Sequence, residues 1–269
     1  MYFVSDIGGT KIRTAISWDG AEICEEKIFD TSDNFEVSIA EFEKNVAEYV
    51  KKEPIAAAAV GVAGVLDSKK NRLMASPNLM GWEGKPLAEA LKKIIGTKVV
   101  LENDAVMGGL GEARVGAGRR TSLVGFLTIG TGIGGCKFVD GEPDARAFGF
   151  EPGHMIISYN GDVNYLDQFA SGAAMERIFG KQAEEIDDPE VWEKEAQLLA
   201  IGIHNISVLW SPEMIILGGS LMKKVDIDLV KKFAKQQMTR FPKIPEIVVG
   251  ELGDKAGLVG ALVRLGKKE

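Results

Sequence analysis

The sequence has few of the residues on which several protein classes depend. Its 269 residues include two cysteines and two histidines, and Cys24 and Cys136 lie far apart with no C-x-x-C spacing. This argues against a disulfide framework or a cysteine zinc site and favours a reducing cytoplasm. No basic region followed by a long apolar run opens the chain, so no secretory signal is expected. The longest apolar run, residues 55–66, is too short to span a bilayer.

The sequence also lacks a strong charge of either sign. The formal net charge is -7 at pH 7, and 26% of the residues are charged. Because acidic and basic residues are interspersed, we expect neither nucleic acid nor a membrane surface as a partner. The length and the 45% of hydrophobic residues are ordinary for a globular protein of one large domain or two modest ones.

A glycine turn near the start of the chain is the first feature that suggests a function. The motif SDIGGTK, residues 5–11, lies between apolar segments that predict strands at 2–4 and 12–18. Backbone N–H groups left unbonded at such a turn, together with Lys11, make an anion site. Asp6, at the end of the first strand, offers a carboxylate to a magnesium ion. Taken alone, the motif fits an ordinary hairpin tip equally well.

The second half repeats this arrangement. A strand at 122–129 leads into GTGIGG, residues 130–135, and a strand at 136–139. No helix follows directly, so a dinucleotide-binding Rossmann fingerprint is a poor match, and no P-loop pattern occurs. Further strands are predicted at 22–29, 55–62, 98–101, 214–217 and 246–249, and helices at 35–51, 87–95, 105–114, 189–210, 221–239 and in a terminal segment through 265.

Polar residues and glycines follow several of these strands. The segment END, residues 102–104, ends a short buried strand, and EPGH occupies 151–154. Gly218 and Gly219 also follow a strand, where a bound nucleotide and simple packing are equally good explanations. His204 lies inside a predicted helix and is interpreted as structural.

These motifs, in this order, resemble the ROK family of sugar kinases and regulators, within the actin, hexokinase and Hsp70 superfold. The resemblance covers nearly the whole chain. The similar segments are DIGGTK (6–11) and GTGIG (130–134) to the two phosphate motifs, END (102–104) to the catalytic segment, IILGG (215–219) to the adenosine segment, and E-x-G-H (151–154), SPNL (76–79) and Gly81-Trp82 to the sugar-binding segments.

The resemblance implies an α/β fold with two similar actin/hexokinase-like domains that face across a cleft. The first domain would comprise residues 1–103 with the returning C-terminal helix 255–269, and the second would comprise 104–254. Closure of the cleft would exclude water from the reacting phosphoryl group. A homodimer is expected from the resemblance, with a small-molecule sugar and a nucleotide as ligands.

The resemblance also assigns roles to individual residues. Asp104 is the expected general base, Asp6 the magnesium ligand, and ATP and Mg²⁺ the expected cofactors. Binding of ATP and its phosphates is assigned to Gly8, Gly9, Thr10, Lys11, Gly130, Thr131, Gly132, Gly218 and Gly219. Binding of the sugar is assigned to Asn78, Asn103, Asp104, Glu151, His154 and Asp167.

The chain departs from the family pattern at two places. Many ROK members bind zinc through three cysteines after the histidine, and Ser158, Asn160 and Tyr165 occupy those positions here. Without thiolate ligands, no zinc is expected at that site. Asp167 stands where the family usually has a glutamate that contacts the sugar, which leaves the identity of the sugar open.

The function expected from these motifs is ATP-dependent phosphorylation of a hexose, at its 6-hydroxyl. Glucose is the leading substrate, followed by N-acetylmannosamine, mannose, fructose and allose. The alternatives are a sugar-responsive regulator, a non-catalytic sugar-binding protein, and an ATPase or chaperone of the same superfold. A regulator would usually carry a helix-turn-helix before the first strand, for which Tyr2 leaves no room. The presence of Asp6, Lys11 and Asp104 argues against a non-catalytic protein.

Overall fold

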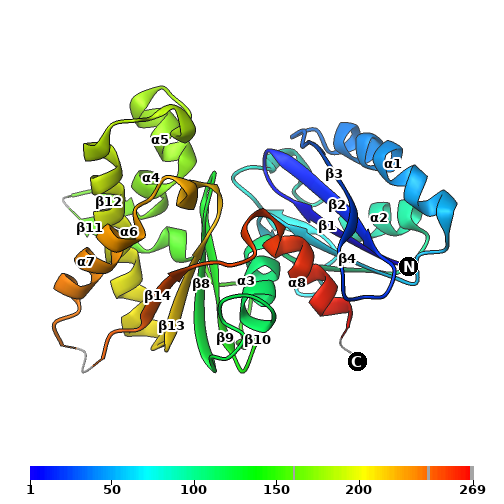
Figure 1. Ribbon diagram of the computed structural model, residues 1–269. Helices are drawn as coiled ribbons and strands as arrows, with labels where there is room; N and C mark the ends of the chain where they lie inside the picture. The colour runs from blue at the N-terminus through cyan, green and yellow to red at the C-terminus, as the bar shows by residue number, and fades with distance from the viewer. Residues whose placement is uncertain (160, 241–242, 267–269) are drawn as a thin grey trace. The chain divides into compact units, whose positions relative to one another are not determined.

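The computed structural model describes residues 1–159, 161–240 and 243–266 (Figure 1). Contacts divide the chain into two compact units. The first unit contains Met1–Gly111, Ala145–Gly149 and the C-terminal segment from Lys255, and the second contains Glu112–Asp144 and Phe150–Asp254. Each unit is therefore assembled from segments that are not contiguous in the sequence.

The first unit is built on a five-stranded sheet in the order β3-β2-β1-β4-β7. Its strands are β1 (Tyr2–Ile7), β2 (Lys11–Ser17), β3 (Cys24–Asp30), β4 (Ala57–Val62) and β7 (Val99–Asn103). β1, β2 and β3 pair antiparallel, whereas β4 lies parallel to β1 and β7 parallel to β4. β1 and β4 are buried along nearly their whole length, as expected for central strands of a sheet that is covered on both faces.

Helices cover the two faces of this sheet (Figure 1). They are α1 (Phe35–Lys52), α2 (Leu87–Ile95), the part of α3 (Asp104–Arg114) up to Gly111, and α8 (Ala256–Leu265). Successive strand residues point to opposite faces. Phe3 accordingly packs with Phe42 of α1, and Val4 packs with Met107 of α3 and Leu258 of α8.

Short elements complete the first unit. They are the two-stranded sheet of β5 (Val65–Leu66) and β6 (Leu73–Ala75) and the 3₁₀ turn η1 (Met80–Trp82). The indole N–H of Trp82 donates a hydrogen bond of 2.9 Å to the carbonyl of Ser32, and its ring lies edge-to-face on Phe35 at a centroid distance of 5.3 Å. These contacts fix the end of the loop that carries Asn78.

The second unit repeats the strand order of the first, as β10-β9-β8-β13-β14. Its strands are β8 (Leu123–Ile129), β9 (Ile133–Val139), β10 (Glu142–Pro143), β13 (Met214–Gly218) and β14 (Glu246–Val249). Again the first three pair antiparallel and the last two are parallel to β8. The predicted fold class, α/β with two similar halves, is confirmed.

The core of the second unit is formed mainly against the long helix α6 (Pro189–Trp210). This helix has the predicted bounds, and Asp188 caps its start by accepting the N–H of Glu190 at 2.9 Å. The remaining elements are β11 (Ile156–Tyr159), β12 (Val163–Tyr165), α4 (Asp167–Ala170), α5 (Gly172–Phe179), α7 (Ile227–Gln237), η2 (Pro152–His154), η3 (Ala183–Glu185), η4 (Ser220–Lys223) and η5 (Gly253–Lys255). Among the described residues, no helix combines the length and hydrophobicity that a membrane span needs.

One predicted helix is interrupted. The pattern predicted a continuous helix at 221–239, but the chain forms the short turn η4 and begins α7 at Ile227. The carboxylate of Asp226 accepts the N–H groups of Asp228 at 2.9 Å and Leu229 at 3.4 Å, and so caps a new helix. An aspartate that bonds its own neighbouring backbone favours a helix start over a helix interior. The prediction of one long helix was wrong for this reason.

Candidate active site

The first glycine turn, Gly8 to Thr10, joins β1 to β2. Its carbonyl groups are engaged by the protein: the hydroxyl of Thr31 donates to Gly8 O at 2.9 Å, and the N–H of Thr31 donates to Thr10 O at 2.9 Å. Within the described residues, the N–H groups of Gly9 and Thr10 have no hydrogen-bond acceptor. A turn with bonded carbonyls and unbonded N–H groups has the polarity of an anion site.

Two further residues of the prediction lie at this turn. A Cβ atom on Gly9 would lie 2.5 Å from the Cβ of Asn78, so the turn is packed directly against the predicted sugar loop. The ammonium of Lys11 forms an ion pair with Asp30, and the Lys11 side chain is half exposed. The positive charge of Lys11 therefore lies beside the turn and is partly neutralised by Asp30.

The side chain of Asp6 is enclosed between two glycines from distant parts of the chain. A Cβ on Gly61 of β4 would lie 3.3 Å from Asp6 Oδ1, and a Cβ on Gly257 of α8 would lie 2.5 Å from Oδ2. Oδ1 is buried and has no hydrogen-bond partner among the described residues. Burial, and next the negative charge of Asp104, raise the pKa of Asp6 to about 7, against the opposing effect of Arg13.

The surroundings of Asp6 fit a magnesium ion. Mg²⁺ prefers oxygen ligands, and protein sites for it use one or two carboxylates while water and phosphate supply the rest. Among the residues that the structure describes, Asp6 has a buried oxygen atom with no hydrogen-bond partner, and the carboxylate of Asp104 lies close enough to act on its pKa. Within residues 1–159, 161–240 and 243–266, no group of three or more His, Cys, Asp or Glu side chains could hold a metal by itself.

Asn103 and Asp104 stand at the junction of β7 and α3. The Oδ1 atom of Asn103 accepts the N–H of Val106 at 3.0 Å and thereby caps α3, while its Nδ2 donates to the carbonyl of Gly64 at 3.0 Å. Asp104 is the first residue of α3, where the helix dipole favours a negative charge. Asn103 thus fixes the start of the helix that presents Asp104. One donor and one acceptor site of its amide remain for a ligand.

The second glycine turn, Gly130 to Gly132, joins β8 to β9. Its carbonyl groups are bonded to the start of α5: Gly172 N–H donates to Gly130 O at 2.7 Å, and Ala173 N–H donates to Thr131 O at 3.0 Å. In the described part of the chain, the N–H groups of Thr131 and Gly132 have no acceptor. The polarity of the first turn is therefore reproduced, although a different element supports it.

The Gly218-Gly219 segment lies beside the second turn. Gly219 has a φ of +92°, and a Cβ there would collide with the carbonyl of Ile129 at the end of β8. A Cβ on Gly130 would lie 3.7 Å from the hydroxyl of Ser220. The backbone of the predicted adenosine segment and the second phosphate turn are therefore neighbours within this unit.

Glu151, His154 and Asp167 form a group next to the first residue of β9. Asp167 Oδ1 accepts the N–H of Ile133 at 2.8 Å. Desolvation raises the pKa of both carboxyl groups, and the nearby His154 opposes this shift in each. The imidazole ring of His154 lies 5.8 Å from the ring of Tyr165, between centroids. The structure thus brings together the three sugar-binding residues that were predicted in this half.

The three positions at which zinc-binding cysteines are replaced fall in and around the β11–β12 hairpin. Ser158 lies in β11 and Tyr165 in β12, whereas Asn160 lies outside the described residues. The absence of zinc at this place stays a prediction.

Sequence reasoning missed several residues that shape the site. Thr31, which no motif singled out, holds the first turn through two hydrogen bonds. Gly257, in the terminal helix, lies against Asp6. No local pattern identifies either role, because each depends on a contact with a segment far away in the sequence.

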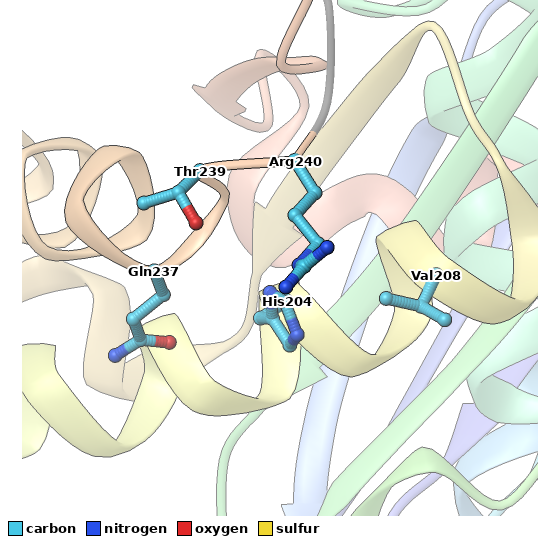
Figure 2. Close-up of a pocket in the computed structure, with 5 residues that line it drawn as sticks. All are labelled: His204, Val208, Gln237, Thr239 and Arg240. Carbon is cyan, nitrogen blue, oxygen red and sulfur yellow. The ribbon is translucent and has the colours of Figure 1, made fainter.

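A pocket of about 380 Å³ lies elsewhere in the second unit, and Figure 2 shows the residues that line it, from α6 and from the end of α7 onward. They are His204, Val208, Gln237, Thr239 and Arg240. None of them belongs to the predicted site. The Nδ1 atom of His204 is buried and has no partner among the described residues.

The model of the ROK family matches residues 2–268 of the chain. The chain belongs to the ROK family. This match includes both glycine turns, the Asn103-Asp104 segment and the group around His154, so it spans every part of the candidate site.

Individual proteins resemble the chain over most of its length. An N-acetyl-D-glucosamine kinase of Histophilus somni is 28% identical, over 97% of this chain and 97% of that protein. A xylose repressor of Caldicellulosiruptor bescii is 25% identical, over 81% of this chain and 65% of the repressor. The structure of a ROK glucokinase from Streptomyces griseus, in complex with glucose and AMPPNP, superposes with a TM-score of 0.87 at 25% identity, covering 98% of this chain and 99% of that one.

Proposed function

We propose that this ROK protein transfers the terminal phosphoryl group of ATP to a hydroxyl of a hexose, at the 6-position of a glucose-like sugar. One observation above all supports the proposal: within one unit, Asp104 lies close enough to the buried carboxylate of Asp6, two residues before the first glycine turn, to raise the pKa of Asp6. Phosphoryl transfer needs an acceptor for the alcohol proton and positive charge around the phosphates. The similar glucokinase, seen with glucose and AMPPNP, supports the same assignment.

The first unit supplies the groups that act on the phosphates. The N–H groups of Gly9 and Thr10 and the ammonium of Lys11 bind phosphate oxygens. Asp6 holds Mg²⁺, with the charge of Asp104 nearby, and a bound Mg²⁺ neutralises negative charge on the phosphate oxygens. Asp104 accepts the proton of the sugar hydroxyl, and its place at the start of a helix favours the negative charge of the acceptor.

The second unit supplies groups that bind and orient. The N–H groups of Thr131 and Gly132 bind phosphate, and Gly218 and Gly219 border the adenosine. Glu151, His154 and Asp167 hold sugar hydroxyls, together with Asn78 and Asn103 of the first unit. Asp167 keeps one carboxylate oxygen for this task, because the other accepts the N–H of Ile133.

Three attendant properties belong to the proposal. The domains would close on their ligands. The protein would act in the cytoplasm as a homodimer. No structural zinc would be bound, since the position after His154 lacks thiolates.

A sugar-responsive regulator is the second candidate, because the xylose repressor of the same family aligns with 81% of the chain. Both a kinase and a regulator need a sugar-binding site, but only the kinase converts the bound sugar and ATP into products. A coupled assay of ADP formation with a panel of hexoses and N-acetylhexosamines separates them. Sugar-dependent ADP formation that is lost in Asp104→Asn is the expected result for a kinase.

A matched control uses Asp228, whose exposed carboxylate lies far from the site in sequence and has a side chain that is 86% exposed. Asp228→Asn should retain full activity. Absence of ADP formation with every sugar, or equal turnover by Asp104→Asn and the parent protein, would refute the kinase proposal. Binding of a sugar without turnover would favour the regulator.

A further inference from the structure

The segment Ala145–Gly149 belongs to the first unit, although the residues before and after it belong to the second. Some interaction must hold this five-residue segment in the first unit. Apolar packing does not, because Ala145, Ala147, Phe148 and Gly149 are all exposed, and the Phe148 side chain is 78% exposed. Arg146 is the one residue of the five that is substantially covered, with a side chain that is 14% exposed.

Arg146 pairs with a buried carboxylate. Its Nη2 atom lies 3.3 Å from Oε2 of Glu102, a side chain that is 8% exposed. The same oxygen is paired with the ammonium of Lys70, and the other oxygen, Oε1, accepts the N–H of Asn103 at 3.1 Å. Glu102 is therefore a buried anion between two cations, at the end of β7.

Each residue of this ion pair is close in sequence to one part of the candidate site. Glu102 directly precedes Asn103 and Asp104, and Arg146 stands five positions before Glu151. Five residues span at most about 17 Å when extended. An anchored Arg146 therefore limits where the chain can place the start of the E-x-G-H segment.

We propose that Arg146 is a positioning residue for the sugar. Its ion pair with Glu102 ties the chain before the sugar-binding segment to the strand end that presents Asp104. This inference rests on the proposed function. A buried carboxylate that loses one of its two cations is left poorly compensated, so the pair is worth more than a surface salt bridge. Arginine suits this role because its guanidinium stays charged and is directional.

Lys70 offers a matched control, since it pairs with the same carboxylate but comes from the turn between β5 and β6. Arg146→Met and Lys70→Met each remove one cation from Glu102, and only Arg146 belongs to the 145–149 segment. We expect Arg146→Met to raise the KM for the sugar about tenfold, with the KM for ATP within about twofold of the parent value. Lys70→Met should change both values less than about threefold.

Two more variants test the pairing itself. Arg146→Lys keeps a cation and should recover most of the affinity for the sugar. Glu102→Gln should act like Arg146→Met, and the double variant should be no worse than the more impaired single one, because both remove the same interaction. Equal effects of Arg146→Met and Lys70→Met, or full additivity in the double variant, would overturn the proposal.

A second readout does not depend on catalysis. Chymotrypsin cleaves after exposed phenylalanine, and Phe148 lies in the tethered segment. Arg146→Met should speed cleavage after Phe148 about fivefold, as mass spectrometry of the fragments can show, while Lys70→Met leaves it unchanged. An unchanged cleavage rate in Arg146→Met would refute the tether even if no sugar is turned over. Absence of turnover in the parent protein, with faster cleavage in Arg146→Met, would instead refute the proposed function and leave the tether standing.

Discussion

The two sheets share one strand order, but their glycine turns are supported differently. The first turn is held by one threonine, Thr31, whose hydroxyl and N–H bond two of its carbonyls. The second is held by the start of α5, where the N–H groups of Gly172 and Ala173 do the same. In both turns the carbonyl groups accept hydrogen bonds and N–H groups remain for a ligand. Two different supporting elements therefore give the two turns the same polarity.

The units differ more in their charges. The first places two carboxylates, Asp6 and Asp104, close enough for one to raise the pKa of the other. In the second, the carboxyl groups of Glu151 and Asp167 share the neighbourhood of a histidine that opposes the shift in their pKa. We infer that the first unit performs the chemistry and the second mainly binds. Substitutions in each unit can test this division.

The division predicts unequal effects for the two aspartates. Asp104→Asn should lower kcat by about 10²- to 10⁴-fold, the usual contribution of a general base. Asp167→Asn should mainly raise the KM for the sugar and leave kcat within about tenfold. Steady-state kinetics with the best sugar of the panel, on variants with unchanged circular dichroism, would show this. A larger fall in kcat for Asp167→Asn than for Asp104→Asn would reverse the assignment.

Filling the space around Asp6 should be costly. A Cβ at residue 257 would press against Asp6 Oδ2, and overpacking of this kind costs about 1–3 kcal/mol of stability. Gly257→Ala should also lower activity by more than tenfold at saturating ATP, by roughly 10²-fold if Asp6 shifts by 1 Å. Thermal melting and the activity assay measure the two effects. Gly125→Ala, whose Cβ would meet nothing closer than 3.4 Å, is the control and should melt normally.

The two turn supports can be compared directly. Thr31→Val removes the hydroxyl that bonds Gly8 O, and Ser171→Ala removes the hydroxyl that caps α5 by accepting the N–H of Ala174 at 3.1 Å. Each should cost about 1 kcal/mol of stability. Both should raise the KM for ATP severalfold, because each loosens one turn. If Thr31→Val left the KM for ATP unchanged, the first turn would not be a phosphate site.

The smallest effect concerns pH and a buried carboxyl group of the second unit. Glu195 of α6 is buried, its Oε1 has no partner within the described residues, and burial raises its pKa from 4.5 to about 8. A carboxyl group whose pKa is higher in the folded state binds more protons there than in the unfolded state. Its favourable contribution is therefore fully present below pH 4.5 and is lost as the pH rises from 4.5 to 8.

Urea unfolding at pH 6 and pH 8.5 measures this effect. The free energy of unfolding of the parent protein should be lower at pH 8.5. Glu195→Gln cannot ionise, so it should show a smaller difference between the two pH values. An equal difference in both proteins would mean that other groups cause the pH dependence.

Local sequence patterns were sufficient for much of the fold. The spacing of apolar residues predicted α2 and α6 with the bounds that the structure shows, because a helix that packs on a sheet repeats its apolar face every three or four residues. The pattern failed at α7, where the capping carboxylate of Asp226 competes with the apolar stripe. That competition depends on side-chain geometry and cannot be read from periodicity.

The features of the candidate site also fall into those that a local sequence pattern identifies and those that it does not. The sequence alone determined the glycine turns, the Asn103-Asp104 segment and the E-x-G-H group, since each is a short run of residue types that suits one kind of chemistry. The contacts of Asp6 with Gly61 and Gly257, of Thr31 with the first turn, and of Arg146 with Glu102 became visible in the folded structure alone. Burial, pKa and ion pairing depend on neighbours brought from distant parts of the chain, and no local pattern specifies those neighbours.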